Sequence, residues 1–178
     1  MKPKVKLATV WLDGCSGCHM SLLDMDERLI DLADRIELVY SPLVDAKQFP
    51  PDVDLTLVEG AVATDEDEHK IRRIRERTKL LVSLGDCAVT GNVPSLRNPF
   101  GTDAVYDRAF RENVDLNPVR PSRHLPVLLE HVKPVHDVVK VDVFVPGCPP
   151  SADAIYFVVG ELLEGRRPDV NAVTRFGK

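Results

Sequence analysis

The sequence predicts an α/β domain of three layers with a mainly parallel β-sheet. Short apolar runs typical of strands alternate with segments of helical periodicity along most of the chain, which is the pattern of helices that cover both faces of a parallel sheet. The 178 residues, 44% of them hydrophobic, fit one domain with a sizeable core and need no disulfides for stability. The whole chain, 1–178, is therefore expected to form a single domain.

The N-terminal half predicts three strands and two helices. Val5–Trp11 is strand-like, and apolar residues at helical spacing follow over 22–32. Ile36–Tyr40 and 53–58 read as the second and third strands, each ended by a turn-forming pair of residues. Thr64 can then begin a helix with acidic residues in its first turn and basic residues later, in agreement with the helix dipole.

The C-terminal half predicts two further strands and up to three helices. The expected elements are a buried strand at 80–84, a loop at 91–101, helices at 104–113 and 125–139, and a strand at 141–145. Pro134 interrupts the helical pattern of 125–139. Ser151 can cap a last helix, Ala152–Leu163, and Gly165 stands where that helix is expected to stop.

Only four cysteines occur, and each cysteine-bearing segment follows a predicted strand. They are the Cys15-x-x-Cys18 pair, Cys87, and Cys148 within Pro-Gly-Cys-Pro-Pro. Sites in open α/β sheets form at the carboxyl ends of the strands, so the four thiols are expected to meet at one edge. A [4Fe–4S] cluster needs one thiolate for each iron, and a Cys-Pro pair often completes such a set. The pattern therefore favours one [4Fe–4S] cluster.

Two other uses of these cysteines are open. Structural zinc usually takes cysteines in two close pairs, whereas Cys87 and Cys148 are isolated in the sequence. A structural zinc-binding module stays as an alternative. A redox-active dithiol at Cys15 and Cys18 leaves the other two cysteines unexplained.

Four polar residues stand beside the cysteines or at a strand end. Asp13, His19 and Asp86 flank cysteines, and Glu59 follows the third strand. They can set hydrogen bonds to the sulfurs or carry protons around a metal centre. The alternative is that Glu59 belongs only to a turn and the others are solvated loop residues.

Composition and charge argue against several functional classes. The formal net charge of −5 gives no electrostatic reason to expect nucleic acid or an anionic membrane as a partner. No apolar stretch approaches the roughly 18 residues that span a bilayer, and residues 1–4 lead directly into a strand, so we expect a cytoplasmic protein without a membrane segment. Phosphate-binding glycine motifs are absent, although a flavin mononucleotide (FMN) at the strand ends is a further candidate.

Four short blocks, in this order, resemble the small subunit of [NiFe] hydrogenases. They are Trp-Leu-Asp-Gly-Cys-Ser-Gly-Cys at 11–18, Val-Glu-Gly-Ala at 58–61, Gly-Asp-Cys-Ala at 85–88 and Pro-Gly-Cys-Pro-Pro at 146–150. The resemblance covers about residues 5–165 and is strongest to the soluble, bidirectional NAD-reducing type. Four ordered blocks are far more specific than any one of them.

This resemblance implies a flavodoxin-like domain in an enzyme complex, a hydrogen:NAD oxidoreductase. Cys15, Cys18, Cys87 and Cys148 would hold the cluster proximal to a nickel–iron site in a separate large subunit. Electrons from hydrogen would continue to diaphorase subunits that contain further Fe–S clusters, FMN and the NAD site. This chain would then relay electrons and perform no bond chemistry itself.

Several sequence differences from related proteins narrow the type of hydrogenase that the chain resembles. A twin-arginine signal and a cysteine-rich C-terminal part, typical of periplasmic and membrane-bound members, are absent, which favours a one-cluster form. His19-Met20 stands where many members carry a glutamate two positions after the second cysteine. The quinone-reducing respiratory subunit usually has adjacent cysteines in its first motif, unlike Cys15 and Cys18. A related cytoplasmic hydrogenase with another electron acceptor is the alternative.

Overall fold

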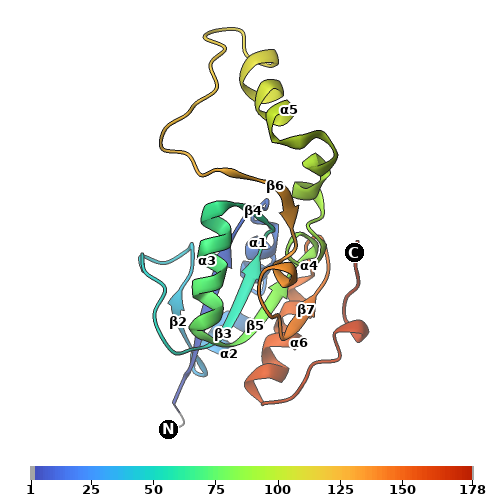
Figure 1. The fold of residues 1–178 in the computed structure, drawn as a ribbon. Helices are drawn as coiled ribbons and strands as arrows, with labels where there is room; N and C mark the ends of the chain where they lie inside the picture. Colours follow the sequence, from blue (N-terminus) through green and yellow to red (C-terminus); the bar gives the residue numbers. More distant parts are fainter. Residues whose placement is uncertain (1–2, 178) are drawn as a thin grey trace.

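A five-stranded parallel sheet lies at the centre of the computed structural model, which describes residues 3–177 (Figure 1). Its strands are β1 (Val5–Trp11), β2 (Ile36–Tyr40), β3 (Val53–Glu59), β5 (Thr78–Leu84) and β7 (Val143–Val145), in the order β2-β1-β3-β5-β7. Every neighbouring pair in this sheet is parallel. The predicted α/β fold with a mainly parallel sheet is confirmed. Residues 1, 2 and 178 of the predicted domain lie outside the described residues.

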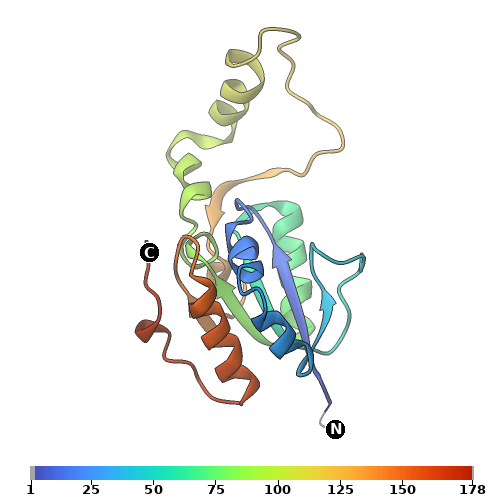
Figure 2. The same cartoon turned by 180° about the vertical axis from the view of Figure 1, so that it is seen from behind.

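Helices cover both faces of the sheet. One face carries α1 (Gly17–Leu23), α2 (Arg28–Ala33) and α6 (Ala152–Leu163). These helices lie in front of the sheet in Figure 2. The other face carries α3 (Asp65–Glu76) and α4 (Asp86–Thr90). Both faces of the central strands are therefore buried, which explains their nearly continuous apolar sequences. Among residues 3–177, no helix is both long enough and apolar enough to span a bilayer.

The two longest helices begin as their sequences predict. The Thr64 hydroxyl accepts a hydrogen bond from the Asp67 N–H at 3.1 Å, and the Asp67 carboxylate accepts one from the Thr64 N–H at 3.0 Å, which completes a capping box at α3. The Ser151 hydroxyl accepts from the Ala154 N–H at the start of α6. Gly165, at φ +71°, follows the end of α6. These local signals are confirmed because each acts within one turn of helix.

The expected helix over 22–32 is divided in the structure. The first helix ends at Leu23 and the second begins at Arg28, with Asp26 in the left-handed region at φ +49° between them. Leu22, Leu29 and Leu32 pack on the same face of the sheet, whereas Leu23 and Ile30 are exposed. The periodicity therefore predicts only part of the buried side and does not predict the break.

The prediction of a helix over 125–139 is wrong. Instead β6 (Leu128–Lys133) pairs antiparallel with β4 (Val62–Thr64), and the short helix η3 (Val135–Asp137) follows Pro134. Asn98 satisfies the free edge of β6, because its side chain accepts from the Val132 N–H at 2.8 Å and donates to the Val132 carbonyl at 3.0 Å. Both partners of β6 are distant in sequence, so pairing outweighs the local helical pattern.

An arm rises above the carboxyl edge of the sheet (Figures 1 and 2). It contains η1 (Val93–Phe100), α5 (Gly101–Asp107) and η2 (Arg108–Glu112), and an extended segment returns from it to β6. The helix expected at 104–113 is thus confirmed, whereas the loop expected at 91–101 is mostly the 3-10 helix η1. Near the C-terminus, η4 (Val170–Ala172) completes the described elements.

Arg75 on α3 joins the helix to the lower end of the sheet. Its guanidinium donates to the Asp142 carboxylate at 2.7 Å and to the Thr78 and Lys79 carbonyls. The same carboxylate accepts from the Leu81 N–H at 2.9 Å. Although burial favours the neutral acid, the Leu81 N–H and the Arg75 guanidinium together lower the pKa of Asp142.

We expect Arg75→Met to reduce the free energy of unfolding by about 2 kcal/mol at neutral pH, because charged hydrogen bonds to partly buried acceptors are lost. Since the folded-state pKa of Asp142 is lowered, the stabilisation is present above its unfolded pKa and is lost as the pH falls through the folded value. Urea unfolding at pH 7 and pH 3 measures both effects. Arg73→Met on the same helix is the control, because Arg73 is exposed. Equal stability of the two variants at pH 7 would contradict this assignment.

Candidate metal centre

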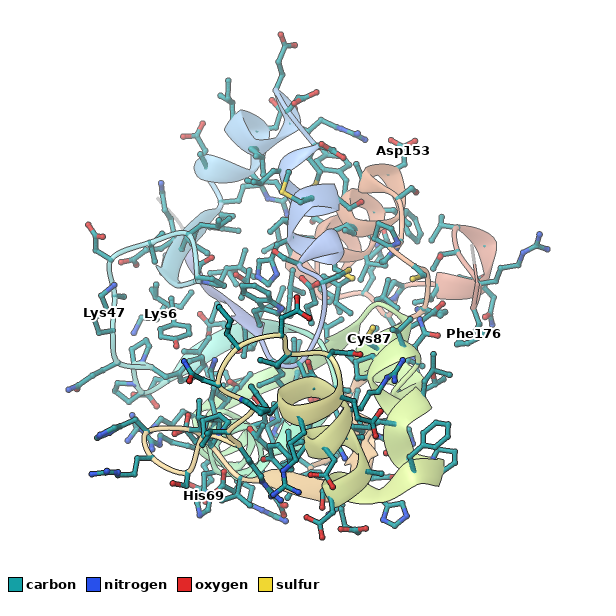
Figure 3. The ribbon with its side chains drawn as sticks, turned by 90° about the horizontal axis from the view of Figure 1, so that it is seen from above. Lys6, Lys47, His69, Cys87, Asp153 and Phe176 are labelled. Carbon is teal, nitrogen blue, oxygen red and sulfur yellow. The ribbon has the colours of Figure 1, made fainter. Side chains whose placement is uncertain are left out.

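Three parallel strands deliver the four cysteines to one edge of the sheet. Cys15 and Cys18 follow β1, Cys87 lies in α4 directly after β5, and Cys148 follows β7. All four are free thiols, and they range from buried Cys18 to exposed Cys15 and Cys148. Figure 3 looks down on this edge, with Cys87 near the middle of the view and Phe176 of the C-terminal segment beside it. The topology therefore gathers the thiols as expected.

The pKa values of Cys18 and Cys87 are raised in this environment. Burial raises the pKa of the Cys18 thiol most, and the negative charges of Glu59 and of the other three cysteines raise it further. Burial likewise raises the pKa of Cys87, and Cys148 and Cys15 add to this effect. A bound metal would favour the deprotonated thiolates by its positive charge, so this environment is compatible with a metal-bound set.

Glycines leave the space that the sulfurs occupy. A Cβ atom built on Gly85 would lie 2.2 Å from the Cys18 Sγ, and one on Gly17 would lie 3.2 Å from the Cys15 Sγ. The Asn92 side chain also donates to the Cys148 Sγ at 3.6 Å. Hydrogen bonds to sulfur are one means by which proteins adjust the potential of an iron–sulfur cluster. The donor set and its surroundings therefore fit a cluster held by four thiolates.

The thiols are not arranged around one point. Within residues 3–177, no three histidine, cysteine, aspartate or glutamate side chains are close enough to hold a single metal ion. A four-iron cluster places each thiolate on a different iron, so its donors do not need to meet at one position.

Three of the four expected polar residues are buried at this edge. His19, Glu59 and Asp86 are each at most 3% exposed. His19 contacts the Glu59 carboxylate through its Nδ1 atom and lies 3.0 Å from the Thr9 hydroxyl through its Nε2 atom. Asp13 is exposed, and its backbone forms an isolated β-bridge to Ala61. The structure thus brings three of these residues together with the cysteine segments and leaves Asp13 in contact with solvent.

Asp86 joins two cysteine segments and the C-terminal segment. Its carboxylate accepts from the Gly147 N–H at 2.7 Å and from the Gly177 N–H at 2.8 Å. Thr174 adds a second connection, because its hydroxyl donates to the Pro146 carbonyl at 2.6 Å. Asp86, which directly precedes Cys87, therefore holds the loop before Cys148 in place.

Replacing Asp86 with asparagine should lower the free energy of unfolding by about 1–3 kcal/mol, because an amide group facing two N–H donors leaves one of them without an acceptor. Amide hydrogen exchange at Gly147 should accelerate more than exchange in the central strands. Asp45→Asn, at an exposed position, is the control. Unchanged exchange at Gly147 would contradict the role given to Asp86.

Several residues of this edge have little local signal in the sequence. Asn92 lies in a segment rich in glycine, proline and asparagine, has a backbone φ of +32° and donates to the Cys148 sulfur. Thr9 and Ser41 are single polar residues in or after apolar strands, and the Thr9 hydroxyl donates to Ser41 at 2.8 Å. An isolated hydroxyl in a buried strand is the one indication that could have pointed to Thr9.

Comparisons with known proteins agree with this geometry. The family model described as NADH ubiquinone oxidoreductase, 20 Kd subunit, matches residues 15–162. The delta chain of the NAD-reducing hydrogenase HoxS from Cupriavidus necator is 39% identical, over 97% of this chain and 86% of the relative. A crystal structure of an NAD+-reducing [NiFe]-hydrogenase in the H2-reduced state superposes with a TM-score of 0.93 at 38% identity, covering 98% of this chain and 99% of the other. The chain belongs to the [NiFe] hydrogenase small-subunit family.

Other members of this family are longer. One relative from Methanocaldococcus jannaschii, a subunit of the F420-non-reducing hydrogenase vhu, is 39% identical over 92% of this chain, but the match covers only 58% of that relative. The chain thus spans little more than half the length of several hydrogenase subunits that it matches.

Proposed function

We propose that this hydrogenase small subunit relays electrons through one [4Fe–4S] cluster held by Cys15, Cys18, Cys87 and Cys148. The observation that carries the proposal is that three strands bring four free thiols to one edge of the sheet. Burial, with a smaller contribution from neighbouring negative charges, raises the pKa of the two more buried thiols, Cys18 and Cys87. When bound, such a cluster supplies reversible one-electron chemistry. The protein groups at the site would bind the cluster, orient its ligands and shield it from solvent.

Each part of the edge has a separate task in this proposal. Buried Cys18 would bind the side of the cluster that faces the protein core. Exposed Cys15 and Cys148 would bind the side that faces solvent, where a partner subunit can approach. Asn92 orients toward the Cys148 sulfur, and Gly85 leaves room for Cys18. Such surroundings restrict the movement of Cys148 and Cys18, so less reorganisation is needed there when an electron arrives or leaves.

Iron and acid-labile sulfide, measured on anaerobically purified protein, should each come to about four per chain. An iron-type visible absorption band should bleach with dithionite. Stoichiometric zinc with no such band would favour the structural zinc module and overturn the proposal. Iron near two per chain would also contradict a four-iron cluster.

The partners follow from the family, and they are part of this proposal. A nickel–iron large subunit would deliver electrons from hydrogen, and diaphorase subunits with Fe–S clusters, FMN and an NAD site would receive them. The C. necator relative is named for NAD reduction, which supports this acceptor. An FMN close to this chain and the cytoplasmic location stay predictions, and the flavin can be tested by fluorescence after acid release.

A second candidate is a related hydrogenase with another electron acceptor. The M. jannaschii relative has the same 39% sequence identity as the C. necator relative but is named as part of an F420-non-reducing hydrogenase. Sequence identity alone therefore does not determine the electron acceptor. Hydrogen-dependent reduction of NAD, NADP and ferredoxin by the purified complex separates the two candidates. Reduction of ferredoxin without any nicotinamide response would favour the second.

A further inference from the structure

Helix α1, which contains Cys18, begins without a cap of its own. The residue in the capping position, Ser16, has φ +66° and its side chain makes no hydrogen bond to the helix. The first N–H groups of a helix have no partner within the helix, and they need an acceptor from elsewhere when they are buried. In this chain the second and third helical residues are Cys18 and His19, and both are buried.

Glu59 supplies the missing acceptor from another part of the fold. Its Oε2 atom accepts from the His19 N–H at 2.9 Å, and its Oε1 atom lies 3.4 Å from the Cys18 N–H. Glu59 ends β3 in register with Trp11, so its side chain starts directly below the loop that leads to Cys15. Gly14 permits this close passage, because a Cβ atom there would be 3.2 Å from the Gly60 Cα.

The imidazole of His19 extends this connection into the sheet. Its two nitrogens contact the Glu59 carboxylate and the Thr9 hydroxyl, and Thr9 in turn donates to Ser41. His19 and Glu59 are 3% and 2% exposed. Burying a carboxylate is costly unless donors satisfy it. Here two helix N–H groups donate to it, and one ring nitrogen of His19 contacts it. The side chain of Glu59 is therefore fixed from three directions.

We propose that Glu59 is a positioning residue that caps α1 from β3 and, with His19, fixes the direction of the Cys18 sulfur. The inference rests on the proposed function, because the sulfur it orients is one of the four cluster ligands. Neither Glu59 nor His19 bonds to a sulfur in the structure. Glu59 acts through the backbone N–H groups of α1, and His19 acts through the contacts of its ring. Their effect is therefore on how firmly Cys18 is held.

The test compares Glu59→Gln and His19→Phe in the full chain, reconstituted anaerobically with iron and sulfide. Glutamine has the same shape but only one acceptor oxygen, so one of the two α1 N–H groups loses its partner. Phenylalanine removes both ring contacts and leaves the bond between the His19 N–H and Glu59 in place. Glu37→Gln on β2, an exposed carboxylate on another strand, is the matched control.

We expect an iron chelator to remove the cluster from Glu59→Gln about 10- to 100-fold faster than from wild type, in the range typical for groups that orient metal ligands. Loss from His19→Phe should be accelerated less, and loss from Glu37→Gln should match wild type. The electron paramagnetic resonance spectrum of the reduced cluster should change in shape in Glu59→Gln, which a general loss of stability would not cause.

Two results would overturn the inference while leaving the proposed function intact. In one, wild type and Glu59→Gln assemble a cluster with the same spectrum and the same rate of loss. In the other, Glu59→Gln only lowers the melting temperature of the protein without cluster, and the spectrum stays unchanged. A wild-type chain that binds no iron–sulfur cluster would instead refute the proposed function itself.

Discussion

Replacing Cys87 with serine is expected to abolish the complete cluster. A serine hydroxyl is a harder and less acidic donor than a thiol, so the iron on that side loses its thiolate ligand. Cys87 is only partly buried and lies in the short helix α4, so the fold should persist. Iron and sulfide should fall well below four per chain, and hydrogen-dependent reduction of the acceptor should decrease at least tenfold.

A matched variant separates ligand loss from disturbance of α4. Thr90→Ser changes a residue of the same helix and keeps the hydroxyl that donates to the Asp86 carbonyl, so cluster content and electron transfer should be normal. The activity of the proposed nickel–iron large subunit alone, measured as hydrogen–deuterium exchange of the gas, should survive in Cys87→Ser. Normal electron transfer in the Cys87 variant would show that this cysteine is not a ligand.

The sequence contains enough local information to predict the ends of several elements and the place of the thiols. Thr64 and Ser151 cap their helices through contacts within one turn, and such signals do not depend on the rest of the fold. The cysteines follow strands that read clearly as buried, so the rule for parallel sheets places them at one edge. This inference needs only the type of each element and not its exact length.

The missed features depend on partners that are far away in the sequence. Strand β6 forms because β4 and Asn98 satisfy its two edges, and neither is visible in the local pattern of 125–139. The same is true of His19, whose environment is set by Glu59 and Thr9. Asp13 stands two positions before Cys15 and is exposed, whereas Glu59 is far from every cysteine in sequence and is buried beside the Cys18 N–H. Distance along the chain therefore does not decide which polar residues surround the site.

Substituting Gly85 with alanine should have the largest effect of any change outside the cysteines. Gly85 has φ +82° and ψ 159°, a conformation that is essentially restricted to glycine. An added Cβ would also lie 2.2 Å from the Cys18 Sγ and 3.5 Å from the Gly147 carbonyl oxygen. We expect a loss of more than about 3 kcal/mol in the free energy of unfolding and no stable cluster.

Two other glycines separate the causes of this loss. Gly165 shares a positive φ of +71° but has no atom within 4 Å of an added Cβ, so Gly165→Ala should cost only about 1–2 kcal/mol from the backbone conformation. Gly160 lies inside α6 with no neighbour in range and no positive φ. Gly160→Ala should therefore stabilise the protein by about 0.5–1 kcal/mol.

A double-mutant cycle completes the test, because Gly85→Ala should be less damaging when Cys18 is alanine. Removing the sulfur relieves the overlap with the added Cβ but leaves the backbone conformation unfavourable, so part of the lost stability should return in the double variant. The coupling free energy, measured by urea unfolding of the protein without cluster, isolates the contact between position 85 and the Cys18 sulfur. Strict additivity of the two substitutions would mean that Gly85 is needed only for its backbone and that it makes no room for a ligand.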